Sequence, residues 1–324
     1  MTILLTGAAG FIGAHTARAL LVRSERVVGI DNFNAYYDPQ LKRDRVAALC
    51  PQLEHNVLDI VDKPSLDRLF AETKPRAVIH LAAQAGVRHS LKHPYDYLHS
   101  NLAGFLNVLE ACRQHAVDHL VFASTSSIYG SQRNLPFSET MPIQTPLSLY
   151  SESKGANELM AHAYSHLFGF ACTALRFFTV YGPWGRPDMA PVIFSRAILA
   201  GNPIEVYNHG AMRRDFTYIS DIVAGIIGAL GHPPEASPRF AVYNLGASAP
   251  IELEQFIKLV ERAAGRPALR EMKALQAGDM LETYADTRAA AAAFGYAPEV
   301  PIEAGVTELV QWCKNYFANS PTLR

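Results

Sequence analysis

Tyr150 and Lys154 lie four residues apart in a stretch with helical periodicity, so both side chains should fall on one face of a helix, about one turn apart. A free tyrosine has a pKa of about 10 and is a poor base at neutral pH, but an adjacent ammonium group favours its phenolate. Tyr150 could then remove a hydroxyl proton while a hydride leaves the same carbon. Because this spacing is common by chance, the hypothesis needs support from the rest of the chain.

A glycine-rich turn near the N-terminus is the second chemical feature. Segment 6–13 reads TGAAGFIG and follows a short apolar run; its glycines are Gly7, Gly10 and Gly13. Such glycines allow a tight turn, a close approach of the backbone to a pyrophosphate, and close packing of the next helix on the strand. The phosphates would bind free N–H groups at the helix N-terminus, beside Phe11 and Ile12. The spacing is a variant of the GxGxxG dinucleotide fingerprint.

Asp31, 18 residues after Gly13, ends the second apolar run. A carboxylate there can accept hydrogen bonds from adenosine ribose hydroxyls and repel a 2′-phosphate, which favours NAD over NADP. The alternative is an ordinary turn residue, and the nearby Lys42, Arg43 and Arg45 leave the phosphate preference open. Further cofactor contacts are expected at Asn32, Asp59, Ile60, Leu81, Ala82, Ala83 and Asn101.

Four hydroxyl residues, Ser124, Thr125, Ser126 and Ser127, follow another apolar run. They are either a polar turn or part of a ligand site, because ligands of parallel sheets bind at the carboxyl ends of the strands. In the second case we expect Ser124 at the cofactor and the Thr125 hydroxyl beside Tyr150, where it would hold the reacting oxygen.

The elements that must position these groups alternate between short apolar runs and longer helical stretches. We predict strands at 2–6, 26–30, 53–57, 77–80, 119–123 and 171–176, with helices at 12–24, 63–72, 101–115 and 151–167. This alternation predicts an α/β fold with a Rossmann-type, doubly wound parallel sheet.

After residue 180 the sequence becomes rich in proline and glycine. We therefore expect a cofactor-binding domain over 1–180 and a smaller mixed α/β substrate domain over 181–324. Segment 240–245 has the pattern of another buried strand, so part of 215–246 should pack back on the first domain. Helices are also expected at 189–200 and 253–264.

Composition excludes several classes of protein. The 324 residues are 49% hydrophobic and carry 29 basic and 30 acidic side chains, which gives no basic field for nucleic acid or lipid. No apolar run is long enough to cross a bilayer, and no export signal precedes the first strand, so a cytoplasmic location is expected. The four cysteines stand far apart and no metal-ligand spacing occurs, so we expect no metal.

Together, the glycine turn, the Tyr150/Lys154 pair and the hydroxyl cluster resemble the extended short-chain dehydrogenase/reductases that act on nucleotide sugars. Two segments, RFFTVYGPWGRPDM at 176–189 and YNHGAMRRDFTY at 207–218, resemble the UDP-glucuronate 4-epimerases in particular. This resemblance implies NAD as cofactor, a UDP-sugar as substrate, and inversion at C4 through a transient 4-keto sugar. It also implies that Arg214 clamps the diphosphate, with Arg88 and Asp279 near the nucleotide; for the last two, a surface ion pair is the alternative.

Serines at 126 and 127 separate the possible reactions within this family. Related dehydratases and decarboxylases carry carboxylates at these places, and two serines cannot readily supply a general acid and base. Oxidation of a uronic acid at C4 gives a β-keto acid, which loses carbon dioxide unless its carboxylate is restrained. We predict that Thr125, Ser126, Ser127 and Thr179 bind this carboxylate and that Arg186 selects its charge.

Three alternatives remain open at this stage. They are a UDP-glucose/UDP-galactose 4-epimerase, a UDP-glucuronate decarboxylase, and a non-catalytic NAD-binding sensor. Relatives often dimerise through two helices, so a homodimer through 101–115 and 150–167 is expected.

Overall fold

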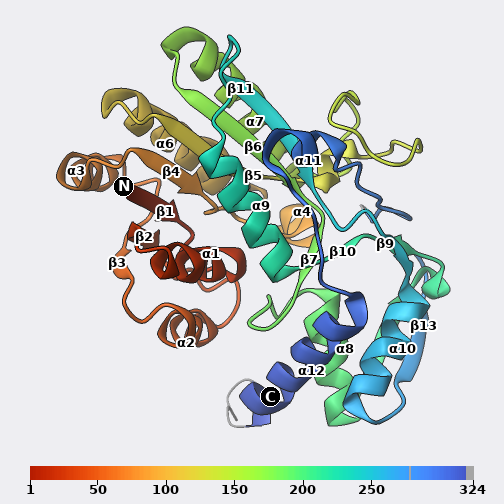
Figure 1. The fold of residues 1–324 in the computed structure, drawn as a ribbon. Coiled ribbons are helices and arrows are strands. Elements are labelled where there is room, and N and C mark those ends of the chain that lie inside the picture. The colour runs from red at the N-terminus through yellow and green to blue at the C-terminus, as the bar shows by residue number, and fades with distance from the viewer. Residues whose placement is uncertain (277–278, 319–324) are drawn as a thin grey trace.

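A seven-stranded parallel sheet forms the centre of the part of the chain that the structure, a computed structural model, describes: residues 1–276 and 279–318 (Figure 1). Its spatial order is β3-β2-β1-β4-β5-β6-β11. The strands are β1 (Thr2–Thr6), β2 (Arg26–Asp31), β3 (Glu54–Val57), β4 (Ala77–His80), β5 (His119–Thr125), β6 (Ala171–Phe177) and β11 (Phe240–Leu245). The predicted doubly wound sheet is confirmed, with segment 240–245 as its seventh strand.

Helices cover both faces of the sheet, which explains why its central strands are almost continuously apolar. Alternate residues of β1 show the division, since Ile3 and Leu5 belong to one core and Leu4 to the other. The first core is closed by α1 (Phe11–Val22), α9 (Ile219–Gly231) and α11 (Arg288–Phe294). The second core is closed by α3 (Lys63–Thr73), α6 (Gly104–Gln114) and α7 (Leu149–Phe168). None of the described helices has the length and apolar character needed to cross a membrane.

Short elements fill the connections at the carboxyl edge of the sheet. They are α2 (Pro39–Leu49), α4 (Val87–Lys92), α5 (Pro94–Tyr97), the π-helix η1 (Leu98–Ala103) and the 3₁₀ turn η2 (Ser126–Tyr129). Helix α2 was not predicted, because its inward face carries the polar residues Lys42 and Arg45 beside Leu41 and so lacks an apolar period. The predicted helix 101–115 is really the end of η1 followed by α6, since apolar spacing does not distinguish a π turn from an α turn.

The C-terminal half builds a third core outside the sheet, where α8 (Ala190–Ala200), α10 (Leu253–Ala264) and α12 (Ile302–Ala318) lie together (Figure 1). Three two-stranded sheets and one 3₁₀ turn, η3 (Asn208–Gly210), accompany these helices. The strands are β7 (Thr179–Tyr181) with β10 (Phe216–Tyr218), β8 (Pro203–Tyr207) with β13 (Leu269–Lys273), and β9 (Arg213–Arg214) with β12 (Ile251–Glu252). Ile12, Val180 and Ile227 pack against both this core and the sheet. The expected domain boundary near residue 180 stays a prediction.

Candidate active site

The turn between β1 and α1 is closed so tightly that only glycine fits at two of its positions. A Cβ on Gly13 would lie 2.0 Å from the Gly7 carbonyl oxygen, and one on Gly7 would lie 2.7 Å from the Ala82 nitrogen. Gly7 also has φ +70°, in the region that favours glycine. No side chain caps the N-terminus of α1, so its free N–H groups and the bare backbone of the turn suit a pyrophosphate.

Asp31 lies beside this turn, at the carboxyl end of β2. Its buried carboxylate accepts hydrogen bonds from the backbone N–H of Ala9 (3.1 Å) and of Phe33 (2.8 Å). The neighbouring Asn32 amide donates to the Asp59 carboxylate (2.8 Å). These contacts hold the carboxylates at the expected ribose end of the site.

The three cations that left the phosphate preference open have partners within the chain. Lys42 Nζ donates to the Asn34 backbone oxygen (3.0 Å) and side-chain oxygen (2.8 Å). Arg45 donates to the Ala9 carbonyl oxygen (2.7 Å), and the Arg43 guanidinium lies 5.6 Å from the ring centre of Phe33. Because these groups stabilise the loop itself, their presence in the sequence is no argument for a bound 2′-phosphate.

The remaining predicted cofactor residues follow β3 and β4 or lie in η1. The Ala82 N–H donates to Thr6 Oγ1 (3.1 Å), which fixes the 81–83 segment against the glycine turn. Ile60 is buried. Asn101, within η1, accepts from the Gln84 N–H (2.8 Å) and donates to Ser153 Oγ (2.9 Å). The Asn101 side chain therefore joins the segment after β4 to helix α7. A direct contact between Asn101 and the cofactor stays a prediction.

Helix α7 presents Tyr150 and Lys154 from its first two turns. Ser148 caps the helix and forms a reciprocal capping box with Ser151 (3.2 Å in each direction). Lys154 is 1% exposed, and this burial lowers its pKa to about 8 against the Glu158 carboxylate, which raises it. Burial raises the pKa of Tyr150, while a hydrogen bond with Thr125 and the charge of Arg186 lower it. Thr125 and Arg186 therefore both act on the phenol.

The hydroxyl cluster lies where β5 passes into η2. Thr125 Oγ1 accepts from the Ser127 N–H (3.2 Å) as the cap of that turn, and Ser126 is buried. The Ser124 side chain points towards α7, where its hydroxyl donates to Glu158 Oε1 (2.5 Å). Thr179 begins β7 and is half-buried, with its N–H bonded to the Asp215 carbonyl oxygen (3.1 Å).

Arg186 is held by a carboxylate that sequence reasoning did not single out. Its guanidinium donates to both oxygens of Asp188 (3.0 and 2.6 Å), and the Tyr36 hydroxyl donates to the same carboxylate (2.8 Å). Tyr36 stands against Gly86, where any Cβ would lie 2.6 Å from its hydroxyl oxygen. The spacing Arg-x-Asp was a signal for the ion pair, but nothing in the sequence indicates that residue 36 joins it.

At the expected nucleotide end, Arg88 and Asp279 pair with each other (3.2 Å). The Arg88 guanidinium also lies 4.9 Å from the ring centre of Tyr207. Arg214 donates to the carbonyl oxygens of Met280 and Leu281. The structure thus brings Arg88 of α4 together with Asp279 and Arg214 of the C-terminal half. Their contact with a nucleotide stays a prediction.

Among the described residues, one group has the composition of a metal site: His89, His93 and Asp96, whose ligand atoms lie within 4.8 Å of one another. The rings of His89 and His93 are stacked, with centres 4.4 Å apart and planes 20° apart. An imidazole nitrogen directs its lone pair within the ring plane, so two stacked rings do not point at a common ion. The group is arranged as an aromatic stack.

A doubly wound parallel sheet with an open glycine turn, and a tyrosine and lysine at its carboxyl edge, defines a dinucleotide-dependent enzyme of the short-chain dehydrogenase/reductase class. The comparisons with known proteins give the family. Residues 3–246 match the model of the NAD dependent epimerase/dehydratase family, and the chain belongs to it. NAD, the cofactor predicted from Asp31, is therefore confirmed as the cofactor of the family.

Relatives and solved structures match the chain along almost its whole length. A probable UDP-glucuronate 4-epimerase of Rhizobium meliloti is 42% identical, covering 99% of each chain. The UDP-glucuronic acid 4-epimerase of Bacillus cereus, solved with UDP-glucuronic acid and NAD, is 33% identical with a TM-score of 0.89, covering 98% of this chain and all of the other. The UDP-glucose 4-epimerase of Thermotoga maritima, solved with UDP-glucose, is 28% identical with a TM-score of 0.89 over the same shares.

Proposed function

We propose that this protein is an NAD-dependent nucleotide-sugar 4-epimerase that interconverts UDP-glucuronate and UDP-galacturonate. The observation that carries the proposal is the position of Arg186, close enough to Tyr150 for its charge to act on the phenol. The uronate carboxyl group is carried by C5, the neighbour of the reacting C4, so a cation beside Tyr150 is well placed for it. The relatives from Rhizobium meliloti and Bacillus cereus support the same assignment.

Proton transfer at C4 falls to Tyr150. Its phenolate oxygen takes the proton of the C4 hydroxyl, while the Thr125 hydroxyl, which hydrogen-bonds with Tyr150, holds the same sugar oxygen. The buried ammonium of Lys154 stabilises the phenolate. Bound NAD supplies the hydride acceptor and, in the return step, the hydride donor. The glycine turn, Asp31 and the 81–83 segment would hold it at the edge of the sheet.

Inversion requires that the 4-keto sugar turn over while its nucleotide stays fixed. We assign the binding of the nucleotide to Arg214. Arg88 and Asp279 would give up their mutual ion pair and contact the diphosphate and the ribose instead. The carboxylate of the keto acid must be restrained meanwhile, because it loses carbon dioxide readily. We assign this restraint to Arg186 and to hydroxyl or backbone donors of Thr125, Ser126, Ser127 and Thr179.

The second candidate is a 4-epimerase of neutral UDP-hexoses. Arg186 donates to both carboxylate oxygens of Asp188, so its positive charge is already neutralised within the chain. This pairing favours a sugar without a carboxylate. The Thermotoga maritima structure is a relative of that kind.

Separate incubations with UDP-glucuronate and with UDP-glucose, each followed by mass spectrometry and proton NMR of the product, distinguish these possibilities. The proposal expects unchanged mass and an altered coupling of the sugar H4. Loss of carbon dioxide would identify a decarboxylase instead. Turnover of UDP-glucose alone would identify the neutral-sugar enzyme, and no reaction with either sugar would leave an NAD-binding protein without this activity.

We also propose that two copies pair through α6 and α7. Large apolar side chains stand exposed on these helices and on η1: Leu98, Leu106, Leu159, Leu167 and Phe168. Leu159→Glu should therefore give the monomer mass in sedimentation equilibrium. Leu269→Glu, at a similarly exposed leucine on β13, is the control and should leave the mass unchanged. A monomeric unmodified protein would refute the dimer.

A further inference from the structure

A buried ion pair joins α7, the helix that carries Tyr150 and Lys154, to strand β6. Glu158 on α7 and Arg176 on β6 are joined by two hydrogen bonds (3.0 and 2.7 Å), with side chains 5% and 4% exposed. Burial of two charges costs solvation energy that their attraction often only offsets, and well-packed apolar residues would hold a helix to a strand equally well. A structural role alone therefore does not account for the pair.

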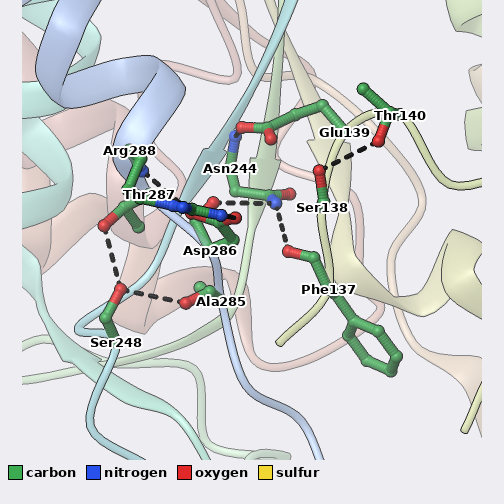
Figure 2. Close-up of polar contacts among 10 residues, drawn as sticks. All are labelled: Phe137, Ser138, Glu139, Thr140, Asn244, Ser248, Ala285, Asp286, Thr287 and Arg288. Carbon is green, nitrogen blue, oxygen red and sulfur yellow. Dashed lines mark hydrogen bonds and ion pairs between the residues drawn. The ribbon is translucent and has the colours of Figure 1, made fainter. Parts of the chain in front are cut away.

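Both partners reach groups at the carboxyl edge of the sheet. Glu158 Oε1 accepts the Ser124 hydroxyl (2.5 Å) one residue before Thr125. Arg176 donates to the Tyr129 hydroxyl (2.9 Å), which in turn donates to Asn244 Oδ1 (2.7 Å). Figure 2 shows the other side of Asn244, whose amide binds the carbonyl oxygens of Phe137 (2.8 Å) and Asp286 (3.1 Å). The pair thus joins α7 to the ends of β5, β6 and β11.

Glu158 is also the acidic group closest in sequence to Lys154 on the inner face of α7. It follows Lys154 by four residues, so the two side chains are neighbours one turn apart. Its charge raises the pKa of Lys154, against the burial that lowers this pKa to about 8.

Other titratable groups also face this part of the site. From β4, His80 faces the Lys154 ammonium, but burial first and the Lys154 charge second lower the pKa of His80 to about 3, so His80 is neutral. Arg176 lies on the side of Glu158 away from Lys154 and is bonded to the Tyr129 hydroxyl. The charge of Arg186, in the 182–189 loop, lowers the pKa of Tyr150.

We propose that Glu158, held in place by Arg176, is a positioning residue that keeps the Lys154 ammonium charged and fixes Ser124 at the end of β5, so that Tyr150 can ionise. This inference depends on the proposed function only in taking Tyr150 and Lys154 as the proton-transfer pair. It concerns a buried residue whose carboxylate oxygens are bonded to Ser124 and Arg176.

Glu158→Gln tests the proposal by removing the charge while keeping the shape. Ionisation of Tyr150 is followed by ultraviolet difference titration of the NAD-loaded protein, with Tyr150→Phe as the subtracted reference. Loss of the Glu158 charge should move the Tyr150 ionisation upward by about one pH unit, a tenfold loss of phenolate at a given pH. With the working substrate, kcat should fall about tenfold and KM should change less than twofold. Because the titration contains no sugar, it remains informative even if UDP-glucuronate is not the substrate.

Folding is controlled with a second variant, because Glu158→Gln leaves Arg176 buried without a counter-charge. Glu158→Gln/Arg176→Met removes both charges at similar volume and should fold, with the Tyr150 ionisation still displaced upward. Glu261→Gln is the matched control, because Glu261 on α10 forms a partly buried pair with Arg270 on β13 (3.0 Å). It should give the same Tyr150 titration as the unmodified protein. A double variant with unmodified Tyr150 titration and kcat would overturn the proposal and leave the pair as a packing element.

Discussion

Single charges, rather than a charged surface, decide what the proposed site can accept. The chain has nearly equal numbers of acidic and basic residues, yet a UDP-uronate carries a diphosphate and a carboxylate. Arg186 lies at the proposed reacting end and Arg214 at the expected nucleotide end, and each is half-buried. In a site of reduced polarity one placed guanidinium counts for more than many exposed ones. The same reason makes an added negative charge costly there.

Ser127→Glu is the prediction that belongs to this scale. A carboxylate added to the hydroxyl cluster should repel a uronate and raise KM for UDP-glucuronate at least tenfold, about 1.4 kcal/mol, through like-charge repulsion. Ser127→Ala is the uncharged control and should raise KM much less. Steady-state kinetics measure both variants, and an unchanged KM in Ser127→Glu would place the carboxylate elsewhere.

The elements that shape the site are held by backbone packing as well as by side chains. The first turn of α1 lies so close to Gly7, and Gly7 so close to Ala82, that neither Gly13 nor Gly7 leaves room for a Cβ. The π turn of η1 aims Asn101 at Gln84 and Ser153, and so joins the segment after β4 to α7, the helix that carries Tyr150 and Lys154. An α turn would rotate this side chain away, since the two helices differ in residues per turn.

Gly13→Ala tests the glycine turn. The new methyl group would lie 2.0 Å from the Gly7 carbonyl oxygen, so α1 must move away from the turn that contains Gly7. We expect a loss of stability of about 2 kcal/mol or more and loss of NAD retention through gel filtration. Gly231→Ala, at the end of α9 where no atom lies within 4 Å, should change neither property. Retention of NAD by Gly13→Ala would show that the turn can relax.

Across the whole molecule, buried neutral histidines make stability depend on pH. Burial is the main cause that lowers the pKa of His15 and His119 to about 4 and that of His80 to about 3. The unfolded chain binds protons at these sites below about pH 6.5, whereas the folded chain does not until the pH is much lower. The contribution of these histidines to the free energy of unfolding is thus complete above pH 6.5 and is lost as the pH falls towards their folded-state pKa values.

Urea denaturation at pH 7.5 and pH 5 checks this expectation. The free energy of unfolding should fall by about 2 kcal/mol for each of the three histidines at pH 5. His119→Gln should reduce the fall, because Gln does not titrate in this range. His166→Gln, at an exposed histidine of α7, is the matched substitution for comparison. Equal pH dependence in His119→Gln and the unmodified protein would contradict the assignment.

Much of the fold and the core of the site could be predicted from the sequence because they depend on local patterns. Apolar runs alternating with helical periods predict a parallel sheet, and three glycines three residues apart predict the turn that closes on it. Tyr150 and Lys154 share a face because four residues make about one helical turn. These features involve neighbours in the chain, so their spacing alone determines their geometry.

Only the tertiary structure decided which distant residues meet. Tyr36 reaches Asp188 across 152 positions, and Glu158 finds Arg176 on the adjacent strand. Lys42 and Arg45 looked available to a phosphate in the sequence, yet the fold places both against backbone oxygens of their own chain. Burial, long-range hydrogen bonds and the pKa values that follow from them depend on the packing of several elements at once. The spacing of residues along the chain does not contain that information. Only the tertiary structure therefore shows which charged groups lie around Tyr150 and Lys154.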